Sequence, residues 1–354
     1  MPQRTAIGAV APRAPQVSNT GFPVKIGTHF YDCPFVNNPV FSSLFPVVLL
    51  IAIGFIAGRV GWIRAEALKD LSNLVFMVLT PALLFRAMSS VHIEQLDFKP
   101  VALYFVAIGI LYAAVFAAQG RNTRAAVLAL AATFSNTVMI GIPLIGLAYG
   151  QAALVMLLTL ISVHALILLT AATIVLEVME ARQLRAAQAL GGAPSRHLWQ
   201  TVFTAVKNGI IHPVPLPIIL GLLFAQTGLV IPGVLDRPLQ LLGTAFGPMA
   251  LLLVGATLTQ VQVGPHLRAA LGISFLKNLL LPVLVAAVCW LSGLRGLNLT
   301  VMVVAASLPM GANVFLFAQR YQVAQELVTA SMAVSTVLGL ATITLAMSLV
   351  GLLA

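Results

Sequence analysis

Long apolar stretches separated by short polar segments recur along the chain from residue 39 to its end. An α-helix needs about 20 mainly apolar residues to cross the hydrocarbon core of a bilayer. Stretches of this kind lie at residues 39–58, 69–88, 99–118, 125–148, 151–177, 208–228, 237–260, 267–291, 297–319 and 323–353. The pattern predicts an all-α polytopic membrane protein with ten transmembrane helices.

The polar segments divide the chain into four parts. Residues 1–38 are rich in Pro, Gly and small residues and lack an apolar run of signal-peptide length, so we expect an uncleaved, disordered tail. Residues 39–178 hold the first five predicted helices, and residues 208–354 hold the second five. Residues 179–207 between them form the one substantial predicted loop, which we expect in the cytoplasm.

The two sets of five helices resemble each other. At a constant offset of 167 residues, Pro46, Gly54, Gly61 and Pro81 match Pro213, Gly221, Gly228 and Pro248. Because each set contains an odd number of helices, the second must enter the membrane from the opposite face. The sequence therefore predicts an inverted repeat, an architecture that alternating-access transporters often use.

The fourth predicted helix contains an unusually polar segment, "TFSNTVMIGIPL", at residues 133–144. A proline inside a helix removes one backbone hydrogen bond and clashes with the preceding turn, but it is well placed in the first turn of a new helix. We therefore expect a break near Gly141, with Pro143 restarting the helix. In the ninth helix, Pro309 and Gly311 predict a second break, with Asn313 capping the restarted half.

Two broken helices at corresponding positions of inverted repeats are a strong sequence indication of a transport site. The restarted halves would point their N-termini, which carry partial positive charge, at the middle of the membrane, where they suit an anionic group. The predicted substrate site contains Asn136, Thr137, Gly141, Pro143, Pro309, Gly311 and Asn313. The alternative is a simple kink in each helix, with the Asn and Thr side chains bonded to neighbouring helices.

Two ionisable side chains lie inside predicted helices. Lys277 lies deep in the eighth helix, so we include it in the substrate site as a cation that attracts the anion. Its alternative role is to neutralise the C-terminal carbonyls of a half-helix at the crossing. His164 in the fifth helix is a candidate for proton coupling, and the alternative is a hydrogen-bonded histidine that packs between helices.

Composition narrows the class of protein. The chain is 60% hydrophobic and 8% charged, which excludes a soluble protein of 354 residues. The net charge of +10 is spread over short loops and not over a basic domain that could bind nucleic acid. No metal site or cofactor is predicted, because the two cysteines, Cys33 and Cys289, are isolated.

The charged residues also predict orientation and coupling. With the N-terminus outside, the inward-facing segments carry eleven Lys and Arg residues and the outward-facing segments carry seven, which predicts both termini on the outer side. All nine acidic residues lie in the tail, in loops or near helix ends. Proton coupling through a buried carboxylate is therefore disfavoured, while coupling through His164 and uniport of an anion are both left open.

The segments "SNTVMIGIPLIGLAYG" and "LPMGANVFLFAQRY" resemble the auxin efflux carrier family, which includes plant PIN proteins and bacterial malonate- or malate-type permeases. The segments "PVVLLIAIGFIAGRVGWI", "LVFMVLTPALLFRAM" and "FLKNLLLP" are similar to the family's first, second and eighth helices. The resemblance covers residues 39–354. It implies two inverted five-helix repeats with broken, crossing helices 4 and 9, as in sodium/proton antiporters and bile acid symporters. It also implies transport of small organic anions at the crossing.

Asn136 and Pro143 match the asparagine and the crossing proline of the family's fourth helix. Val314 stands where plant members have a second crossing proline, and Ser135 stands where they have a proline before the asparagine. These departures favour a bacterial-type permease for small carboxylates or dicarboxylates, in the inner membrane, over a carrier of auxin. Such carriers are often homodimers, although no motif here requires one.

Two other classes of function compete with a carrier. An intramembrane enzyme would need a buried carboxylate pair, a metal-spaced cluster or a nucleophile with a base, and the sequence offers none of these. A channel or a transporter-derived sensor would need rings of pore-lining charge or an attached signalling domain, which are also missing. We therefore expect a secondary carrier.

Overall fold

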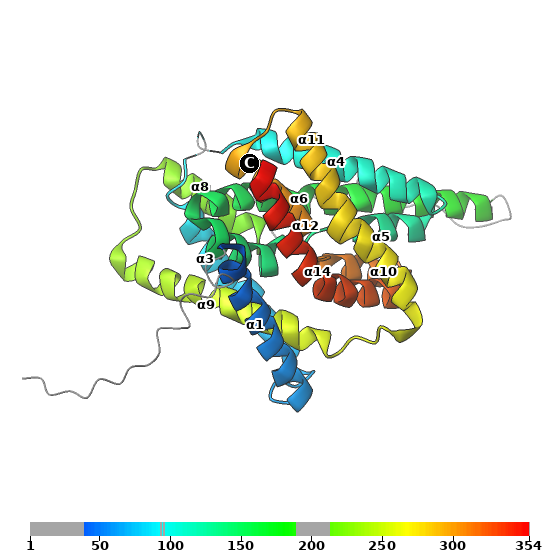
Figure 1. Cartoon of the computed structure of the whole chain (residues 1–354), viewed down its shortest axis with the longest axis horizontal. Coiled ribbons are helices and arrows are strands. Elements are labelled where there is room, and N and C mark those ends of the chain that lie inside the picture. Colours follow the sequence, from blue (N-terminus) through cyan, green and yellow to red (C-terminus); the bar gives the residue numbers. More distant parts are fainter. Residues whose placement is uncertain (1–38, 93, 95, 189–212, 354) are drawn as a thin grey trace, which may run out of the picture.

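A computed structural model describes residues 39–92, 94, 96–188 and 213–353 (Figure 1). The predicted tail and most of the predicted loop at 179–207 lie outside the described residues. The first half contains α1 (Pro39–Val60), α2 (Ala67–Leu74), η2 (Val75–Leu79), α3 (Thr80–Met88), α4 (Phe98–Ala118), α5 (Thr123–Ala131), η4 (Thr137–Gly141) and α6 (Ile142–Gln188). The second half contains α8 (Pro215–Gln226), α9 (Gly233–Leu258), η5 (Gly264–His266), α10 (Leu267–Phe275), η6 (Leu276–Leu280), α11 (Leu281–Leu291), α12 (Gly296–Ser307), α13 (Asn313–Arg320) and α14 (Gln325–Leu353).

Seven helical segments in the described part of the chain are long and apolar enough to cross a membrane. They are Ser42–Val60, Ala67–Met88, Phe98–Ala118, Thr137–Met179, Gly233–Leu258, Gly264–Leu291 and Gln325–Leu352. Two shorter apolar helices, Pro215–Gln226 and Gly296–Ser307, lie where the sixth and ninth spans were predicted. The protein is thus an all-helical polytopic membrane protein.

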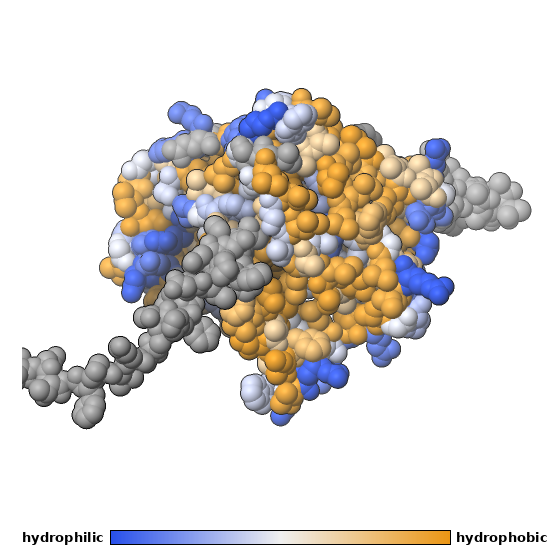
Figure 2. Space-filling view, in the orientation of Figure 1, coloured by the Kyte–Doolittle hydropathy of each residue, from blue (hydrophilic) through white to orange (hydrophobic). Residues whose placement is uncertain are grey.

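The surface agrees with this class. Figure 2 shows a face covered mostly by apolar residues, with polar residues gathered toward its edges. Exposed large apolar side chains occur on almost every long helix, including Phe45 in α1, Val106 in α4 and Leu345 in α14. A soluble protein would bury most of this surface, whereas lipid solvates it.

The long helix α6 covers two predicted spans. Its backbone is non-helical at Gly150, where φ is 74° and ψ is −163°, a conformation that glycine adopts without strain. The chain therefore turns at Gly150, close to the predicted boundary between the fourth and fifth spans. Beyond this point the helix continues to Gln188, nine residues past the predicted start of the loop at residue 179.

The helices pack in two groups. One group contains α1, α2, α3, α8 and α9, and we call it the scaffold group. The other contains α4, α5, α6 and α10 to α14, and we call it the crossing group. Within the scaffold group, Gly54 of α1 lies against the main chain of Leu252 in α9, and Gly255 of α9 lies against the main chain of Ile51 in α1. Small residues at these positions let the two backbones approach closely, as is common between membrane helices.

In the described part of the chain, three wide π-type turns interrupt the helices, and each ends two residues before a proline. These turns are η2 before Pro81, η4 before Pro143 and η6 before Pro282. In each turn a backbone N–H bonds to the carbonyl five residues earlier, as in the bond from Ile142 to Thr137. A proline lacks its own N–H and clashes with the carbonyl four residues earlier. The wider turn relieves that clash and lets the helix continue.

Candidate functional site

The two broken helices meet at their breaks. In the first, the chain leaves α5 at Ala131 and resumes a helix at Thr137, and in the second it leaves α12 at Ser307 and resumes at Asn313. The N–H of Asn136 donates to the carbonyl of Pro309 at 2.8 Å, and the N–H of Gly311 donates to the carbonyl of Phe134 at 2.9 Å. These bonds form an antiparallel bridge between Ser135 and Met310. Each break thus supplies hydrogen-bond partners for backbone groups of the other. These partners are necessary because lipid cannot form hydrogen bonds with exposed N–H and C=O groups.

Two glycines let the breaks come this close. A Cβ atom on Gly311 would lie 2.7 Å from the ring of Phe134, and one on Gly141 would lie 2.8 Å from the side chain of Leu308. Both distances are too short for carbon atoms. A side chain at position 311 would push against the Phe134 ring and the main chain of Ser135, whereas one at position 141 would displace the flexible end of Leu308. The role of these two predicted site residues is therefore to allow close packing at the crossing.

The first broken helix restarts earlier than predicted. The restart is at Thr137 and not at Pro143, because the side chain of Asn136 serves as the N-cap: its Oδ1 accepts the N–H of Met139 at 3.3 Å. Pro143 lies in the helix after the wide turn η4, and its ring packs against Gly247 of the scaffold helix α9. The expected break near Gly141 is thus wrong by about one and a half helical turns.

The second broken helix restarts without a side-chain cap. The N-cap is Ala312, which has no polar side-chain atom, and Asn313 is the first helical residue. The prediction that Asn313 caps α13 is therefore wrong, because the break ends one residue too early for its side chain to reach back to the helix N–H groups. Ala312 is exposed at this position, so the N-terminus of α13 is open toward the space next to the crossing.

Lys277 lies in η6, and its ammonium group reaches the C-terminal end of α12. It is not part of the lining of the space around Asn136. Its ammonium is fully buried and donates to the carbonyls of Ala306 at 2.7 Å and Leu308 at 2.6 Å. Carbonyls at a helix C-terminus lack helical partners and carry partial negative charge. Lys277 answers both needs, as the alternative interpretation of this residue predicted.

The residue after Lys277 holds the other side of the crossing. The Nδ2 of Asn278 donates to the carbonyl of Ser335 at 2.7 Å, and the Oγ of Ser335 donates to the Oδ1 of Asn278 at 2.7 Å. The same Oγ accepts the N–H of Met310 at 3.0 Å. This buried network joins η6, α14 and the second break. This network was not predicted from the sequence. The signal available for it was the presence of two polar residues, Asn278 and Ser335, within apolar helices.

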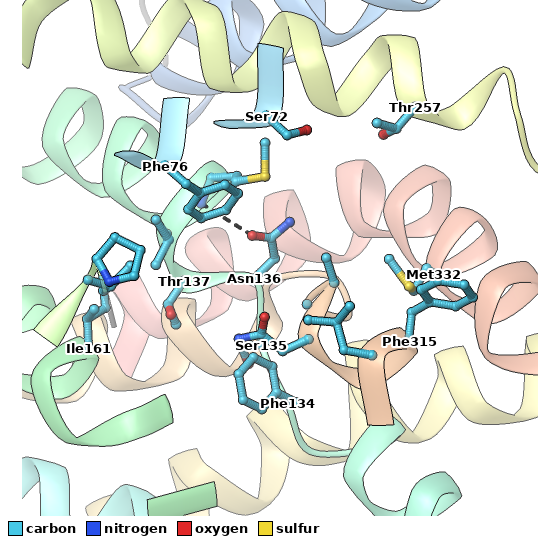
Figure 3. Close-up of a pocket in the computed structure, with 18 of the residues that line it drawn as sticks. Ser72, Phe76, Phe134, Ser135, Asn136, Thr137, Ile161, Thr257, Phe315 and Met332 are labelled. Carbon is cyan, nitrogen blue, oxygen red and sulfur yellow. Dashed lines mark hydrogen bonds between the residues drawn. The ribbon is translucent and has the colours of Figure 1, made fainter. Parts of the chain in front are cut away.

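A cavity with a volume of about 680 Å³ lies between the crossing group and the scaffold group. Its polar lining comes from Ser72, Asn73, Ser135, Asn136, Thr137, His164, Thr257, Gln260, Asn313 and Thr329. Figure 3 shows the side chain of Asn136 pointing across the cavity toward the side where Ser72 and Thr257 lie. None of the described residues that line the cavity is Asp, Glu, Lys or Arg. A solute inside would therefore meet dipoles and uncharged hydrogen-bonding groups.

Five of the predicted site residues line this cavity, namely Asn136, Thr137, His164, Gly311 and Asn313. The other four predicted residues are not part of the lining. They lie at or beside the two breaks, outside the cavity wall, and are Gly141, Pro143, Pro309 and Lys277. Ser72, Asn73, Thr257 and Gln260 from the scaffold group were missed. Their signal in the sequence was weak, because polar residues near the ends of membrane helices are common.

His164 is the one titratable residue in the lining. Its side chain is 1% exposed, and its ring centroid lies 4.9 Å from that of Phe134 and 5.9 Å from that of Tyr104. The hydroxyl of Tyr104 lies 3.2 Å from the Oγ of Ser135. Within the described ranges, no group of three or more His, Cys, Asp and Glu residues could hold a metal ion.

The chain is similar to several known proteins. It is 27% identical over 309 residues to a protein of Rhizobium meliloti (strain 1021) named "Putative malonate transporter", covering 84% of this chain and 92% of the relative. It is 23% identical over 310 residues to an "Uncharacterized transporter" of Methanothermobacter thermautotrophicus, covering 86% and 96%. It is 25% identical over 303 residues to the "Uncharacterized transporter YfdV" of Escherichia coli (strain K12), covering 83% and 92%.

Residues 39–347, which include both breaks and the cavity lining, match the family described as "Membrane transport protein". The match extends over most of the chain and agrees with the motifs quoted above. The chain therefore belongs to this membrane transport protein family, the auxin efflux carrier family, and is a membrane transporter and not an enzyme.

Proposed function

We propose that the protein carries small organic anions across the membrane by alternating access at the crossing of the two broken helices. The observation that carries this proposal is the cavity of about 680 Å³, which contacts both breaks and lies between the two helix groups. A site at such a boundary can be opened to one face or the other when one group moves against its neighbour.

The helix N-termini at the crossing favour an anion. η4 and α13 both begin at the cavity, and their N-terminal residues Thr137 and Asn313 are part of its lining. Free N–H groups and the helix dipole give such an end partial positive charge. The start of α13 has no side-chain cap. The N–H groups of Val314 and Phe315 already donate to the carbonyls of Gly311 and Ala312, so the attraction of a carboxylate to this end comes mainly from the helix dipole.

Two-fold related contacts support the inverted repeat that alternating access needs. Gly54 lies against Leu252, and Gly221 lies against Phe85. At the offset of 167 residues, Gly54 corresponds to Gly221 and Phe85 corresponds to Leu252. The repeat therefore relates the contact between Gly54 and Leu252 to the contact between Gly221 and Phe85. Gly61 and Gly228, which match at the same offset, both have positive φ, of 84° and 68°. We propose ten crossing segments, five in each repeat.

The orientation follows from the positive loops. Ser72, Thr257 and Gln260 line the cavity near helix ends that adjoin the loops at 61–66 and 259–266. We assign these loops to the cytoplasm, because Arg59, Arg64 and Arg268 adjoin them. In this arrangement the termini are outside, and the cavity belongs to a state open toward the cytoplasm of the cell membrane.

The substrate we propose is a small carboxylate, with malonate and related dicarboxylates as the first to test. The size of the cavity and the similarity to a relative named for malonate support this choice. Auxin is a weaker candidate, because Ser135 and Val314 depart from the plant pattern.

Two substitutions of Asn136 test the site. Asn136→Ala removes the N-cap, and Asn136→Asp keeps an acceptor oxygen for Met139 but adds a negative charge at the cavity. We expect both to abolish uptake of labelled malonate and other small carboxylates into liposomes that contain the purified protein. Because Asn136→Asp keeps the N-cap, a loss of transport in this variant reports the effect of the added negative charge and not the loss of the cap.

Asn122→Ala is the matched control. Asn122 caps α5 in the same way, with its Oδ1 accepting the N–H of Ala125 at 2.8 Å, but it is exposed and away from the cavity. Loss of a cap costs about 1 kcal/mol at either site. Transport should survive in Asn122→Ala, and full anion transport by Asn136→Asp would contradict the proposed site.

A further inference from the structure

One polar group in the cavity wall has no role in holding the crossing. The Nε2 atom of His164 is buried and has no hydrogen-bond partner among the described residues. His164 also lines the cavity, one turn along α6 from Ile161, another lining residue. A buried polar atom without a partner is costly, so native proteins rarely keep one unless it has a function.

The neighbours of His164 explain why it stays without a partner. Its ring packs against Phe134, at 4.9 Å between centroids, and Phe105, at 6.3 Å, and neither side chain has a polar atom. The third ring, Tyr104, has its hydroxyl paired with Ser135. The imidazole thus packs among aromatic rings of the crossing group. Because His164 also lines the cavity, a solute bound there can supply the missing partner.

The charges around the cavity limit what that solute can be. Among the described lining residues there is no carboxylate that could balance an imidazolium, and no Lys or Arg that could pair directly with a second negative charge on the solute. The buried ammonium of Lys277 lies outside the lining but acts electrostatically on His164, which disfavours an imidazolium, and it is already bonded to the carbonyls of Ala306 and Leu308. Burying an unpaired charge is far more costly than burying a hydrogen-bonded neutral group. A neutral imidazole suits a hydroxyl or a protonated carboxyl, to which its nitrogen can donate or from which it can accept.

We infer that His164 binds the second polar group of a singly charged, bifunctional acid whose carboxylate lies at the helix N-termini of the crossing. This inference rests on the proposed function and names its substrate class: small monocarboxylates with an additional uncharged hydrogen-bonding group. Hydroxy acids belong to this class, as does the singly protonated form of a short dicarboxylate such as malonate. A carboxylate with a plain alkyl tail leaves Nε2 unpaired and binds more weakly.

The test compares acids that differ by one hydroxyl. Uptake of labelled propionate, 2-hydroxypropionate and 3-hydroxypropionate is measured in liposomes with the full chain. For the wild type we expect at least one hydroxy acid to have a KM roughly tenfold below that of propionate, as one hydrogen bond to a buried group provides. His164→Phe should remove this preference, so that the ratio of the KM of propionate to the KM of the hydroxy acid falls from about ten to about one.

His164→Gln and Tyr112→Phe complete the design. Gln places an amide near the position of Nε2 and should restore part of the preference, which also shows that the site is folded. Tyr112→Phe removes the other buried polar atom without a partner, the Tyr112 hydroxyl on α4, which is not part of the cavity lining, and should leave all three KM values unchanged.

The outcomes separate the two proposals. If the wild type transports none of the small organic acids, the proposed function fails. If it transports the three acids with equal KM, or if His164→Phe keeps the preference for a hydroxy acid, the proposed function stands and the role of His164 is overturned.

Discussion

At the scale of single residues, the crossing depends on side chains that bond to backbone groups. Asn136 caps one restarted helix, Lys277 covers the carbonyls at the end of α12, and Ser335 receives the N–H of Met310. The sequence predicted Asn136 as a site residue because an asparagine is unusual at bilayer depth. It left two roles open for Lys277, because spacing along a helix does not tell which neighbour a long side chain meets.

Lys277→Met tests the structural role of the lysine. Methionine preserves the length of the side chain but leaves the carbonyls of Ala306 and Leu308 without their donor. We expect thermal unfolding in detergent to show a loss of about 1–3 kcal/mol. Because the ammonium is not part of the cavity lining, KM for the transported anion should stay within about twofold of the wild type while the maximal rate falls. Lys99→Met, at an exposed position in α4, should be neutral.

Ser335 and Ser331 form a natural pair for a second comparison. Both are fully buried on α14, one turn apart. The Oγ of Ser331 only bonds back to the carbonyl of Leu327 in its own helix, whereas that of Ser335 bonds to Asn278 and Met310. Ser335→Ala should therefore reduce transport strongly, and Ser331→Ala should not. Equal transport rates in the two variants would show that the network does not hold the second break.

At the scale of elements, the apolar pattern predicted the long helices well, because length and hydropathy are sufficient to define a span. It predicted a break in each of two helices but misplaced the first restart, since the wide turn η4 can accommodate Pro143 after the helix has already resumed at Thr137. Both restarts depend on contacts between distant segments. The bonds from Asn136 to Pro309 and from Gly311 to Phe134 join the two breaks, and the sequence does not show which residues they connect. The N-cap formed by Asn136 is a local signal for the first restart that the sequence analysis did not use.

The close approach of α1 and α9 gives a prediction at this scale. Gly54→Ala would place a Cβ against the main chain of Leu252, which cannot move without shifting α9. We expect a loss of about 1–3 kcal/mol in thermal unfolding, from overpacking. Gly109→Ala in α4 is the control, because no atom lies within 4 Å of the position of its Cβ. If both variants unfold at the same temperature, the helix contact has no energetic importance.

At the scale of the whole molecule, the boundary between the scaffold group and the crossing group contains the cavity. Repeat matching in the sequence predicted related halves, and the exchange of the Gly54 and Gly221 contacts agrees with it. The scaffold wall of the cavity was not predictable, because Ser72 and Thr257 come from helices whose own sequences give no reason to place them opposite Asn136. Only the packing of the two groups brings them together.

Accessibility to a membrane-impermeant thiol reagent tests the arrangement of the whole molecule. In a background without Cys33 and Cys289, Ser72→Cys should react in inside-out vesicles, since Ser72 lines the cavity that we assign to the cytoplasmic side. Ser89→Cys, just past the other end of the same segment, Ala67–Met88, should react in right-side-out vesicles. Labelling of both positions from one face would overturn the assigned orientation.

The backbone bridge between the two broken helices, which we call the clasp, has a consequence for how the sequence of such a carrier can change. Peptide groups, and not side chains, join Asn136 to Pro309 and Gly311 to Phe134. Side chains beside the clasp, apart from those that the close approach requires, such as Gly311, can consequently be exchanged over evolution while the arrangement of the two breaks is kept. Ser135 and Val314, which replace the prolines of plant relatives, illustrate this freedom: the selectivity of the binding chamber can be retuned without rebuilding its frame.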